Sequence, residues 1–505
     1  MINILCLSFS NILNIKFMEI SLNPDYSFKW DKTRIVLYSK SNPSNGGIKD
    51  WCSFLHPIHA IVLGIFSYKH NLSEAISTIQ NYVIIKNEAI ENFISLLKDN
   101  EDFSHLSVSI GNINFPPKLL LSGHFVHPQN DIHRIIEQCL LIKDIDLKTK
   151  RLFHTPLKIT WMLNNNCPVS CIYCYADTKH KHKEISIERF EELMLECKIS
   201  NIAECEVIGG DFFVKENWSR ILEVMQKNGF PPSYLSTKKV LNIGEIETLV
   251  KLNYSGVLQF SLDSLKEDIL KEIIHCPNGY VDKIKKMFTS LSEFSKLPFS
   301  IRVNTVLIQK NTNRESLDEL FTFFSSLNII DEWEIRFAMP SFKKTSSFFC
   351  NREQILWANY YFENLEKKCH FKLNFIEKSI IQDKPVCDLA KEEKYIYRCT
   401  ANMRHFFVLP DGKVTICERL YWNPLFIIGD LNENSIYEVW NSEKANSLYY
   451  YIDKEIDSSS YCFHCSGKNE CFKRKKRCWV DIVNKWDNNI TFPDPICINS
   501  LKQKL

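Results

Sequence analysis

Three closely spaced cysteines, directly after a predicted buried strand, constrain this chain more than any other feature of its sequence. Cys167, Cys171 and Cys174 form the pattern C-x3-C-x2-C in the segment that follows the apolar run 157–163. A short apolar run bounded by polar residues is typical of a buried strand. A [4Fe–4S] cluster takes four ligands, usually cysteine thiolates, so three cysteines leave one iron open to bind another molecule.

Two other uses of this loop are open from the residues alone. A structural zinc site needs a fourth ligand, which His180 or His182 would supply. A disulfide would leave one of the three cysteines unpaired, and disulfides are rare in reducing compartments. The iron–sulfur interpretation accounts for all three cysteines without a further ligand.

The loop resembles the signature of the radical S-adenosylmethionine (SAM) enzymes, including an aromatic residue, Tyr173, before the last cysteine. In that family the open iron binds the amino and carboxylate groups of SAM. The reduced cluster cleaves SAM to methionine and a 5′-deoxyadenosyl radical, which abstracts hydrogen from the substrate. The resemblance implies that Cys167, Cys171 and Cys174 hold the cluster and that Tyr173 lies near the adenine.

Length and charge limit the rest of the chain. Its 505 residues predict about three domains, and the net charge of +2 argues against a nucleic-acid or membrane-surface partner. The sequence has no apolar run of about 18 residues, and its start lacks the basic head and cleavage site of a signal peptide. We expect a cytoplasmic protein, with residues 1–29 an N-terminal extension and Met18 an alternative start.

Residues 30–115 are predicted to form a winged-helix-like unit. The pattern indicates a strand over 34–39, then helices over 56–66, from Asn71 onward and over 87–97. Residues 30–100 carry seven Lys or Arg and six Asp or Glu, so they lack the basic stripe of a DNA reader. The unit resembles the element with which maturases of ribosomally made peptides bind an extended leader peptide at a sheet edge. A structural cap on the catalytic domain is the alternative.

Residues 116–150 are predicted to be a linker that includes a helix over 132–142, and residues 151–345 are predicted to form an α/β domain. Strands alternate with helices there, and we expect the strands at 157–163, 204–208, 234–237, 257–262, 299–307 and 334–337. Six such units imply a parallel sheet with right-handed crossovers, in an incomplete (β/α)6 TIM-like barrel. Chemistry in such barrels gathers at the C-terminal ends of the strands. A bridging helix over 352–368, within 346–386, is expected to follow.

Two predicted strand ends carry the residues that the family uses for SAM. Gly209, Gly210 and Asp211 follow the second strand, where glycines allow close backbone approach and the acid can receive an ammonium group. The family usually has Glu there, so Asp211 is a departure. Ser261 and Asp263 end the fourth strand and resemble the Ser-x-Asp site for the ribose or carboxylate of SAM.

Two further positions complete the predicted SAM site. Asn304 matches a position on the fifth strand of the family. An arginine on the helix after the fourth strand usually holds the SAM carboxylate, and here the nearest candidate is His275. The sequence assigns no catalytic side chain beyond these contacts.

Eight of the 19 cysteines lie in the C-terminal region, residues 387–505. Their spacing resembles the SPASM extension of radical SAM enzymes, with a G-x4-C hairpin that turns at 410–412 and a C-x2-C-x5-C run. Eight thiolates suffice for two auxiliary [4Fe–4S] clusters. The resemblance assigns one cluster to Cys387, Cys399, Cys417 and Cys478, and the other to Cys462, Cys465, Cys471 and Cys497.

This assignment has open points. The C-x6-C spacing from Cys471 to Cys478 departs from the C-x3-C of the family, and Cys369 rivals Cys387 as a ligand. Two structural zinc sites are the alternative. The basic run 473–477 is typical of solvated surface, or of a segment that offsets cluster charge or meets an acidic peptide.

Together these features predict a radical SAM/SPASM peptide maturase that abstracts hydrogen from a precursor peptide and joins a cysteine sulfur to that carbon. The expected partners are a leader-bearing precursor with a cysteine-containing core and an electron donor such as flavodoxin or ferredoxin. A carbon–carbon cyclophane maturase and an anaerobic sulfatase-maturating Cys/Ser oxidase share the same cysteines. Two alternatives involve no radical chemistry: an inactive peptide-binding partner and a zinc-bearing regulator that binds DNA.

Overall fold

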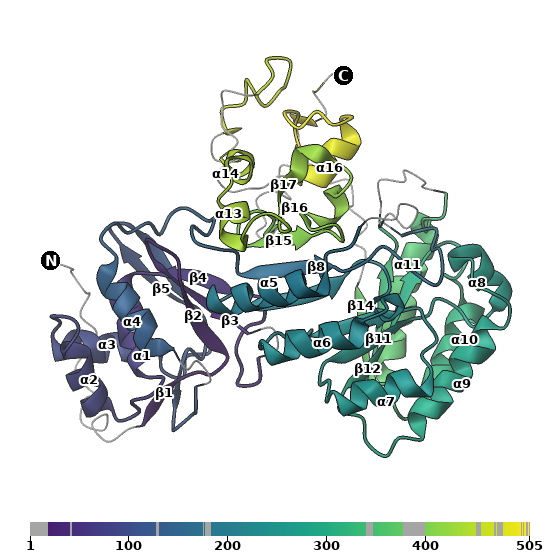
Figure 1. Ribbon diagram of the computed structural model, residues 1–505, viewed down its shortest axis with the longest axis horizontal. Coiled ribbons are helices and arrows are strands. Elements are labelled where there is room, and N and C mark those ends of the chain that lie inside the picture. The colour runs from purple at the N-terminus through teal and green to yellow at the C-terminus, as the bar shows by residue number, and fades with distance from the viewer. Residues whose placement is uncertain are drawn as a thin grey trace. The chain divides into compact units, whose positions relative to one another are not determined.

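The computed structural model of this chain describes residues 19–40, 43–127, 131–174, 176, 183–339, 347–376, 399–450, 456–468, 471, 478–495, 497, 499–500 and 503. The chain divides into two compact units, Met1–Leu157 and Lys158–Leu505, here called the N-terminal and C-terminal units (Figure 1). Over the described ranges, no helix has the length and apolar character that a membrane crossing requires.

The strands of the N-terminal unit form three antiparallel groups. They are β1 (Ile20–Leu22) with β7 (Leu120–Ser122), the sheet β2 (Tyr26–Trp30), β3 (Ile35–Ser39) and β4 (Cys52–Leu55), and the hairpin β5 (Ser104–Val108) and β6 (Gly111–Phe115). β3 is the central strand of its sheet, so β2 and β4 are its edges. The hairpin follows the third helix, where a winged helix carries its wing, and the sequence analysis did not predict it.

The helices of this unit are α1 (Pro57–Ile65), α2 (Leu72–Gln80), α3 (Asn87–Leu97) and α4 (Ile132–Leu141), so all four predicted helices are present. Local chemistry explains where two of them begin. Asn71 caps α2 because its side-chain oxygen accepts from the backbone N–H groups of Ser73 and Glu74. His56 caps α1 through Nδ1, and Pro57 occupies the first turn, where its missing N–H costs nothing.

The C-terminal unit contains the predicted barrel. One parallel sheet has the order β10 (Tyr234–Thr237), β11 (Val257–Ser261), β12 (Ser300–Leu307), β13 (Glu332–Phe337) and β14 (Lys372–Ile376), and β9 (Glu204–Ile208) pairs in parallel with β8 (Lys158–Met162). All six predicted strands are confirmed. β14 is an additional parallel strand that was not predicted from the sequence, and its residues are half-buried or exposed.

Helices alternate with these strands and cover one face of the parallel sheet (Figure 1). They are α5 (Ile187–Ile199), α6 (Trp218–Lys227), α7 (Ile243–Lys251), α8 (Glu267–Ile274), α9 (Tyr280–Ser292), α10 (Arg314–Ser325) and α11 (Arg352–Leu365), with short turns η2 (Phe212–Val214) and η3 (Glu366–Lys368). Apolar strand residues such as Leu258 and Phe260 are buried. The alternate positions, such as Gln259 and Asn304, are polar and also buried, so the opposite face of the sheet is polar rather than an apolar core.

The cysteine-rich region extends the sheet that contains β8 and β9. Its elements are β15 (His405–Val408), β16 (Lys413–Thr415), β17 (Ile427–Asp430), η5 (Glu418–Leu420), η6 (Pro424–Phe426), α13 (Ile436–Trp440), α14 (Glu443–Tyr449) and α16 (Trp479–Lys485). β15 pairs in parallel with β8. β15 and β16 form the predicted hairpin, and Gly412 adopts the positive φ of +86° that its turn requires.

Candidate functional site

The cysteine loop leaves the C-terminal end of β8, and Gly209, Gly210 and Asp211 hold its first half. The N–H of Gly210 donates to the carbonyl of Asn164, and the N–H of Asp211 donates to that of Asn166, both at 2.7 Å. A Cβ on Gly210 would lie 2.2 Å from the carbonyl oxygen of Asn166. The glycine is therefore required for the close approach of the loop itself, whatever ligand also lies here.

The C-terminal end of α8 holds the second half of the loop. The N–H groups of Ser170 and Ile172 donate to the carbonyls of Ile274 and Ile273, each at 2.9 Å. These carbonyls belong to the last turn of α8 and lack helical partners. His275, in the left-handed conformation, places Nδ1 2.7 Å from the carbonyl oxygen of Ser170. His275, the residue suggested to bind the SAM carboxylate, thus contacts the cysteine loop through Nδ1.

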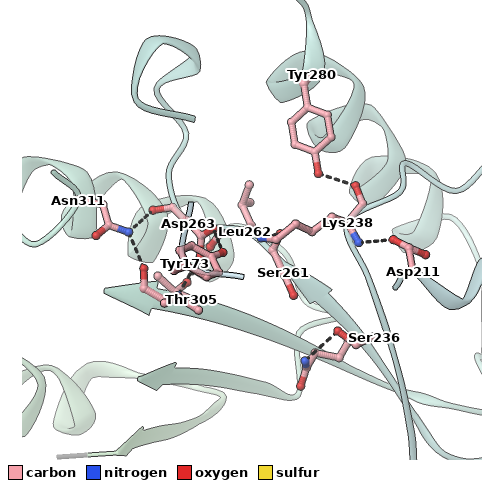
Figure 2. Close-up of polar contacts among 12 residues, drawn as sticks. Tyr173, Asp211, Ser236, Lys238, Ser261, Leu262, Asp263, Tyr280, Thr305 and Asn311 are labelled. Carbon is pink, nitrogen blue, oxygen red and sulfur yellow. Dashed lines mark hydrogen bonds and ion pairs between the residues drawn. The ribbon is translucent and has the colours of Figure 1, made fainter. Parts of the chain in front are cut away.

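Tyr173 connects the cysteine loop to the end of β11 (Figure 2). Its hydroxyl donates to Oδ2 of Asp263 at 2.5 Å, and the Lys238 ammonium donates to the same oxygen at 3.0 Å. The other oxygen of Asp263 accepts from the N–H of Val306 at 2.8 Å. Burial, and then the Asp263 carboxylate, raises the pKa of Tyr173, so the hydroxyl keeps its proton and acts as a donor.

Asp211 is buried and accepts hydrogen bonds within the chain. Oδ2 accepts from the backbone N–H groups of Lys238 and Lys239 at 2.7 and 3.0 Å. The Thr237 hydroxyl lies within 2.9 Å of both oxygens, and Oδ1 also accepts from the N–H of Phe213. The carboxylate therefore joins the end of β9 to the end of β10, and a contact between Asp211 and the amino group of SAM stays a prediction.

The three thiols have the chemistry of metal ligands. Burial, with a smaller effect of nearby acidic groups, raises the pKa of Cys167 to about 11 and that of Cys171 to about 12, although the Lys238 ammonium acts in the opposite direction. Such thiols become thiolates only beside a compensating positive charge, which a cluster iron provides. The side-chain oxygen of Asn165, in the same loop, is buried without a hydrogen-bond partner in the described structure. The loop thus fits a bound iron–sulfur group, although no three described His, Cys, Asp or Glu side chains are already arranged around a single metal position.

The remaining predicted SAM contacts lie on neighbouring strands. Ser261 and Asn304 are register partners on β11 and β12, and the carbonyl of Ser261 accepts from the Lys238 ammonium at 3.2 Å. Asn304 donates to Glu334 at 2.9 Å. The structure therefore brings Tyr173, Ser261 and Asp263 together around Lys238, while the side chain of Asn304 is engaged by β13.

Two residues of this site, Lys238 and Asn311, were not predicted from the sequence. Lys238 directly follows β10, so its place just after a predicted strand was an available signal. Asn311 donates to the backbone carbonyls of Asp263 and Val306, both at 2.9 Å. Nothing in the local sequence around Asn311 marks this role.

The C-terminal cysteines that the structure describes fall into two neighbourhoods. In the first, burial and then Glu418 raise the pKa of the Cys417 thiol, and Cys399 and Cys478 raise it further. These three cysteines belong to the same predicted cluster. Cys387 lies outside the described residues, as do His180, His182 and the basic run 473–477. The rival Cys369 donates through Sγ to the carbonyl of Leu365 at the end of α11.

In the second neighbourhood, around Cys462, Cys465 and Cys471, the contacts are mostly between residues close in sequence, and Asp494 links Cys478 of the first neighbourhood to Cys497. The N–H of Cys465 donates to the carbonyl of Cys462, and that of Cys471 donates to the carbonyl of Gly467. Asp494 accepts from the N–H of Cys478 through Oδ2 at 2.6 Å, and its carbonyl accepts from the N–H of Cys497 at 2.8 Å. The assignment of these ligands to two clusters stays a prediction.

Comparison with known proteins places the two cysteine-bearing regions in known families. Residues 161–324 match the model of the radical SAM superfamily, and residues 399–466 match that of SPASM, an iron–sulfur cluster-binding domain. The antilisterial bacteriocin subtilosin biosynthesis protein AlbA of Bacillus subtilis is 21% identical over 327 residues, which are 63% of this chain and 66% of that protein.

Solved structures of Streptococcus suis SuiB resemble nearly the whole chain. SuiB bound to S-adenosylmethionine superimposes with a TM-score of 0.62 and 15% identity over 94% of this chain and 99% of that one. SuiB bound to its precursor peptide SuiA gives a TM-score of 0.62 and 16% identity over 95% of this chain. At this identity the likeness is one of fold, and it spans both units.

The family matches agree with the geometry of the cysteine loop and the strand ends. Such enzymes use SAM and a [4Fe–4S] cluster, and SPASM domains add auxiliary iron–sulfur clusters. Cys167, Cys171 and Cys174 are the residues that would hold the first cluster. Residues 161–324 are therefore a radical SAM domain and residues 399–466 a SPASM domain, within a chain of α/β fold.

Proposed function

We propose that this enzyme modifies a ribosomally made precursor peptide by joining a cysteine sulfur of its core to a carbon atom, as a thioether. The observation that carries the peptide as substrate is the N-terminal unit. It contains helices α1 to α3 and a three-stranded sheet, as expected for the predicted winged-helix-like unit, and it falls within the part of the chain that superimposes on SuiB bound to a precursor peptide.

The leader of the precursor is proposed to bind at an edge of the β2–β3–β4 sheet. β2 and β4 are the two edges of this sheet, but Tyr26–Lys29 of β2 are buried, whereas Cys52 and Ser53 of β4 are partly exposed, so the edge proposed for the leader is β4. An extended peptide added there gains affinity from backbone hydrogen bonds and register from side-chain pockets. This arrangement would hold the precursor by its leader while the core reaches the barrel.

The thioether reaction removes two hydrogen atoms from the core peptide, one from the thiol and one from carbon. When bound, SAM and its cluster supply the radical that takes the carbon-bound hydrogen. The chain's own residues hold the cysteine loop in place through Gly210, Tyr173 and the C-terminal turn of α8. The second electron needs an acceptor, and the neighbouring Cys399, Cys417 and Cys478 are proposed to hold that auxiliary cluster.

We also propose a reduced flavodoxin or ferredoxin as the electron donor and the cytoplasm as the compartment. No disulfide joins the cysteines that the structure describes. Free thiols and oxygen-sensitive clusters persist where the surroundings are reducing.

The test is to search the reading frames beside the gene for a short cysteine-containing peptide, to co-express that peptide with the chain and to examine it by mass spectrometry. A thioether predicts the loss of two hydrogen atoms and a cysteine that no longer reacts with iodoacetamide. A C167A/C171A/C174A variant is the matched control and should leave the peptide unchanged. Loss of two hydrogens with a cysteine that is still alkylated would point to a carbon–carbon bond or, if the peptide also reacts with an aldehyde reagent, to an oxidised serine. An unmodified peptide would count against the maturase proposal.

A further inference from the structure

The ammonium group of Lys238 is buried at the end of β10, beside the cysteine loop (Figure 2). Its side chain is 10% exposed, and Nζ donates to Oδ2 of Asp263 at 3.0 Å and to the carbonyl of Ser261 at 3.2 Å. Lysine is almost never this buried unless it is paired. The ion pair explains how the charge is tolerated but not what it does there.

The charge lies next to the segment that carries the cluster cysteines. Nζ is 5.8 Å from the ring centre of Tyr173, which stands between Cys171 and Cys174 in the sequence. The Tyr173 hydroxyl shares Oδ2 of Asp263 with the ammonium. Although burial lowers the pKa of Lys238, Asp263 and then Cys171 raise it above its ordinary value, so the ammonium keeps its charge.

Both partners of this ion pair are fixed by backbone contacts. The N–H of Lys238 donates to Asp211 at 2.7 Å, and its carbonyl accepts from the Tyr280 hydroxyl at 2.6 Å. Asp263 accepts from Val306 through Oδ1 and from Asn311 through its carbonyl. The positive charge is thus held at a defined position, rather than free to move away as on a surface lysine.

We propose that Lys238 is a positioning residue that keeps a positive charge beside the cluster of Cys167, Cys171 and Cys174 and thereby raises the reduction potential of that cluster. One-electron reduction adds a negative charge to a cluster and releases no atom. A nearby cation in a low-dielectric site stabilises the reduced form, and nearby charge is one determinant of cluster potentials. This inference rests on the radical SAM cluster and not on the identity of the peptide.

The test is a redox titration of the reconstituted full-length chain, followed by electron paramagnetic resonance without any peptide present. The relevant cluster is the one whose signal changes when SAM is added. K238M should shift its potential to more negative values, K238R should stay near the parent, and D263N should shift it to more positive values. K239M is the matched control, since Lys239 follows directly but its ammonium contacts Glu245 and the carbonyl of Phe213.

The opposite signs separate an effect of charge from a loosening of the loop. An unchanged potential in K238M would overturn the proposal. Shifts of K238M and D263N in the same direction, or loss of cluster iron in both K238M and K238R, would overturn it too, because the side chain would then act only in assembly. Since no peptide is added, these outcomes are independent of whether the proposed thioether is found.

Discussion

The two cysteine-bearing regions of this enzyme are held by different means. The cysteine loop after β8 is fixed by backbone hydrogen bonds to segments far away in sequence, Gly210–Asp211 and Ile273–Ile274. The C-terminal segment from residue 456 onward is held mainly by contacts within itself, such as the bond from the Ser460 hydroxyl to the carbonyl of Thr491 at 2.7 Å. Among its described residues, Ile482, Trp486 and Phe492 form a local hydrophobic cluster, and Val480 and Val483 are buried as well.

This difference indicates what each region needs in order to fold. The barrel supplies the hydrogen-bond partners of the first loop whether or not a cluster is bound. A short segment with a small hydrophobic core gains little burial to offset the entropy of ordering, so we expect cluster binding to contribute to its folding free energy. We infer that the cysteine loop after β8 is already ordered before it binds its cluster. The C-terminal segment, in contrast, becomes fully ordered only when its clusters bind.

The largest expected effect is that of the C167A/C171A/C174A variant. Three [4Fe–4S] clusters predict about twelve irons per chain in the reconstituted parent and about eight in the variant. SAM cleavage should be lost entirely, while the fold survives because the hydrogen bonds of the loop come from its backbone. Iron analysis, SAM cleavage assays and circular dichroism measure these three quantities.

Two results would contradict this prediction. SAM cleavage by the variant would remove the assigned role of the three cysteines. About four irons in the parent and none in the variant would leave the C-terminal cysteines without clusters.

Removal of iron and sulfide should affect the two regions unequally. Hydrogen exchange of residues 478–495 should rise strongly in the cluster-free protein, because their small core no longer receives cluster binding energy. Exchange in β12 should change little, since its backbone hydrogen bonds lie inside the parallel sheet. Mass spectrometry of peptides from both regions checks this, and equal protection in the two states would contradict the inference.

The substitution Gly210→Ala should weaken the barrel loop specifically. The new Cβ would meet the carbonyl oxygen of Asn166 at 2.2 Å, a backbone atom that cannot move aside without displacing the loop. We expect a loss of about 3 kcal/mol of stability and of the SAM-responsive cluster. Gly244→Ala is the control, because its Cβ would meet only Asn242 at 3.4 Å. Denaturant unfolding measures the stability, and iron analysis measures the cluster content. Equal effects of the two variants would contradict this role for Gly210.

The smallest expected effect concerns Glu206 on β9. Burial, and then the neighbouring Glu204, raises the pKa of Glu206. The folded state therefore keeps a proton that the unfolded state loses, and stability falls as the pH rises above the ordinary glutamic acid range. E206Q cannot ionise and should be more stable by on the order of 1 kcal/mol once Glu206 of the parent is deprotonated.

Melting temperatures measured from mildly acidic to alkaline pH check this prediction. The profile of E206Q should be flatter than that of the parent, and that of the exposed-residue variant E247Q should follow the parent. A parent whose stability increases across this range while E206Q stays flat would reverse the assigned sign. The measurement reports the stability of the barrel strands that carry the cysteine loop.

By itself, the sequence determined the features that local rules control. Apolar runs gave the six barrel strands, Asn71 gave the start of α2, and the 410–412 turn gave the hairpin of β15 and β16. The cysteine spacing gave the family. These signals act over a few residues, so a single chain reveals them without knowledge of its partners.

The tertiary structure decided what depends on register between distant strands. It placed Lys238 against Asp263, set Asn166 against Gly210, added β14 to the sheet and paired β15 with β8. No local pattern encodes these contacts, because each forms only after the parallel strands align and bring their C-terminal ends to one edge. The residues predicted to bind the cofactors were visible in the sequence, whereas the residues that hold them in place became visible only in the fold.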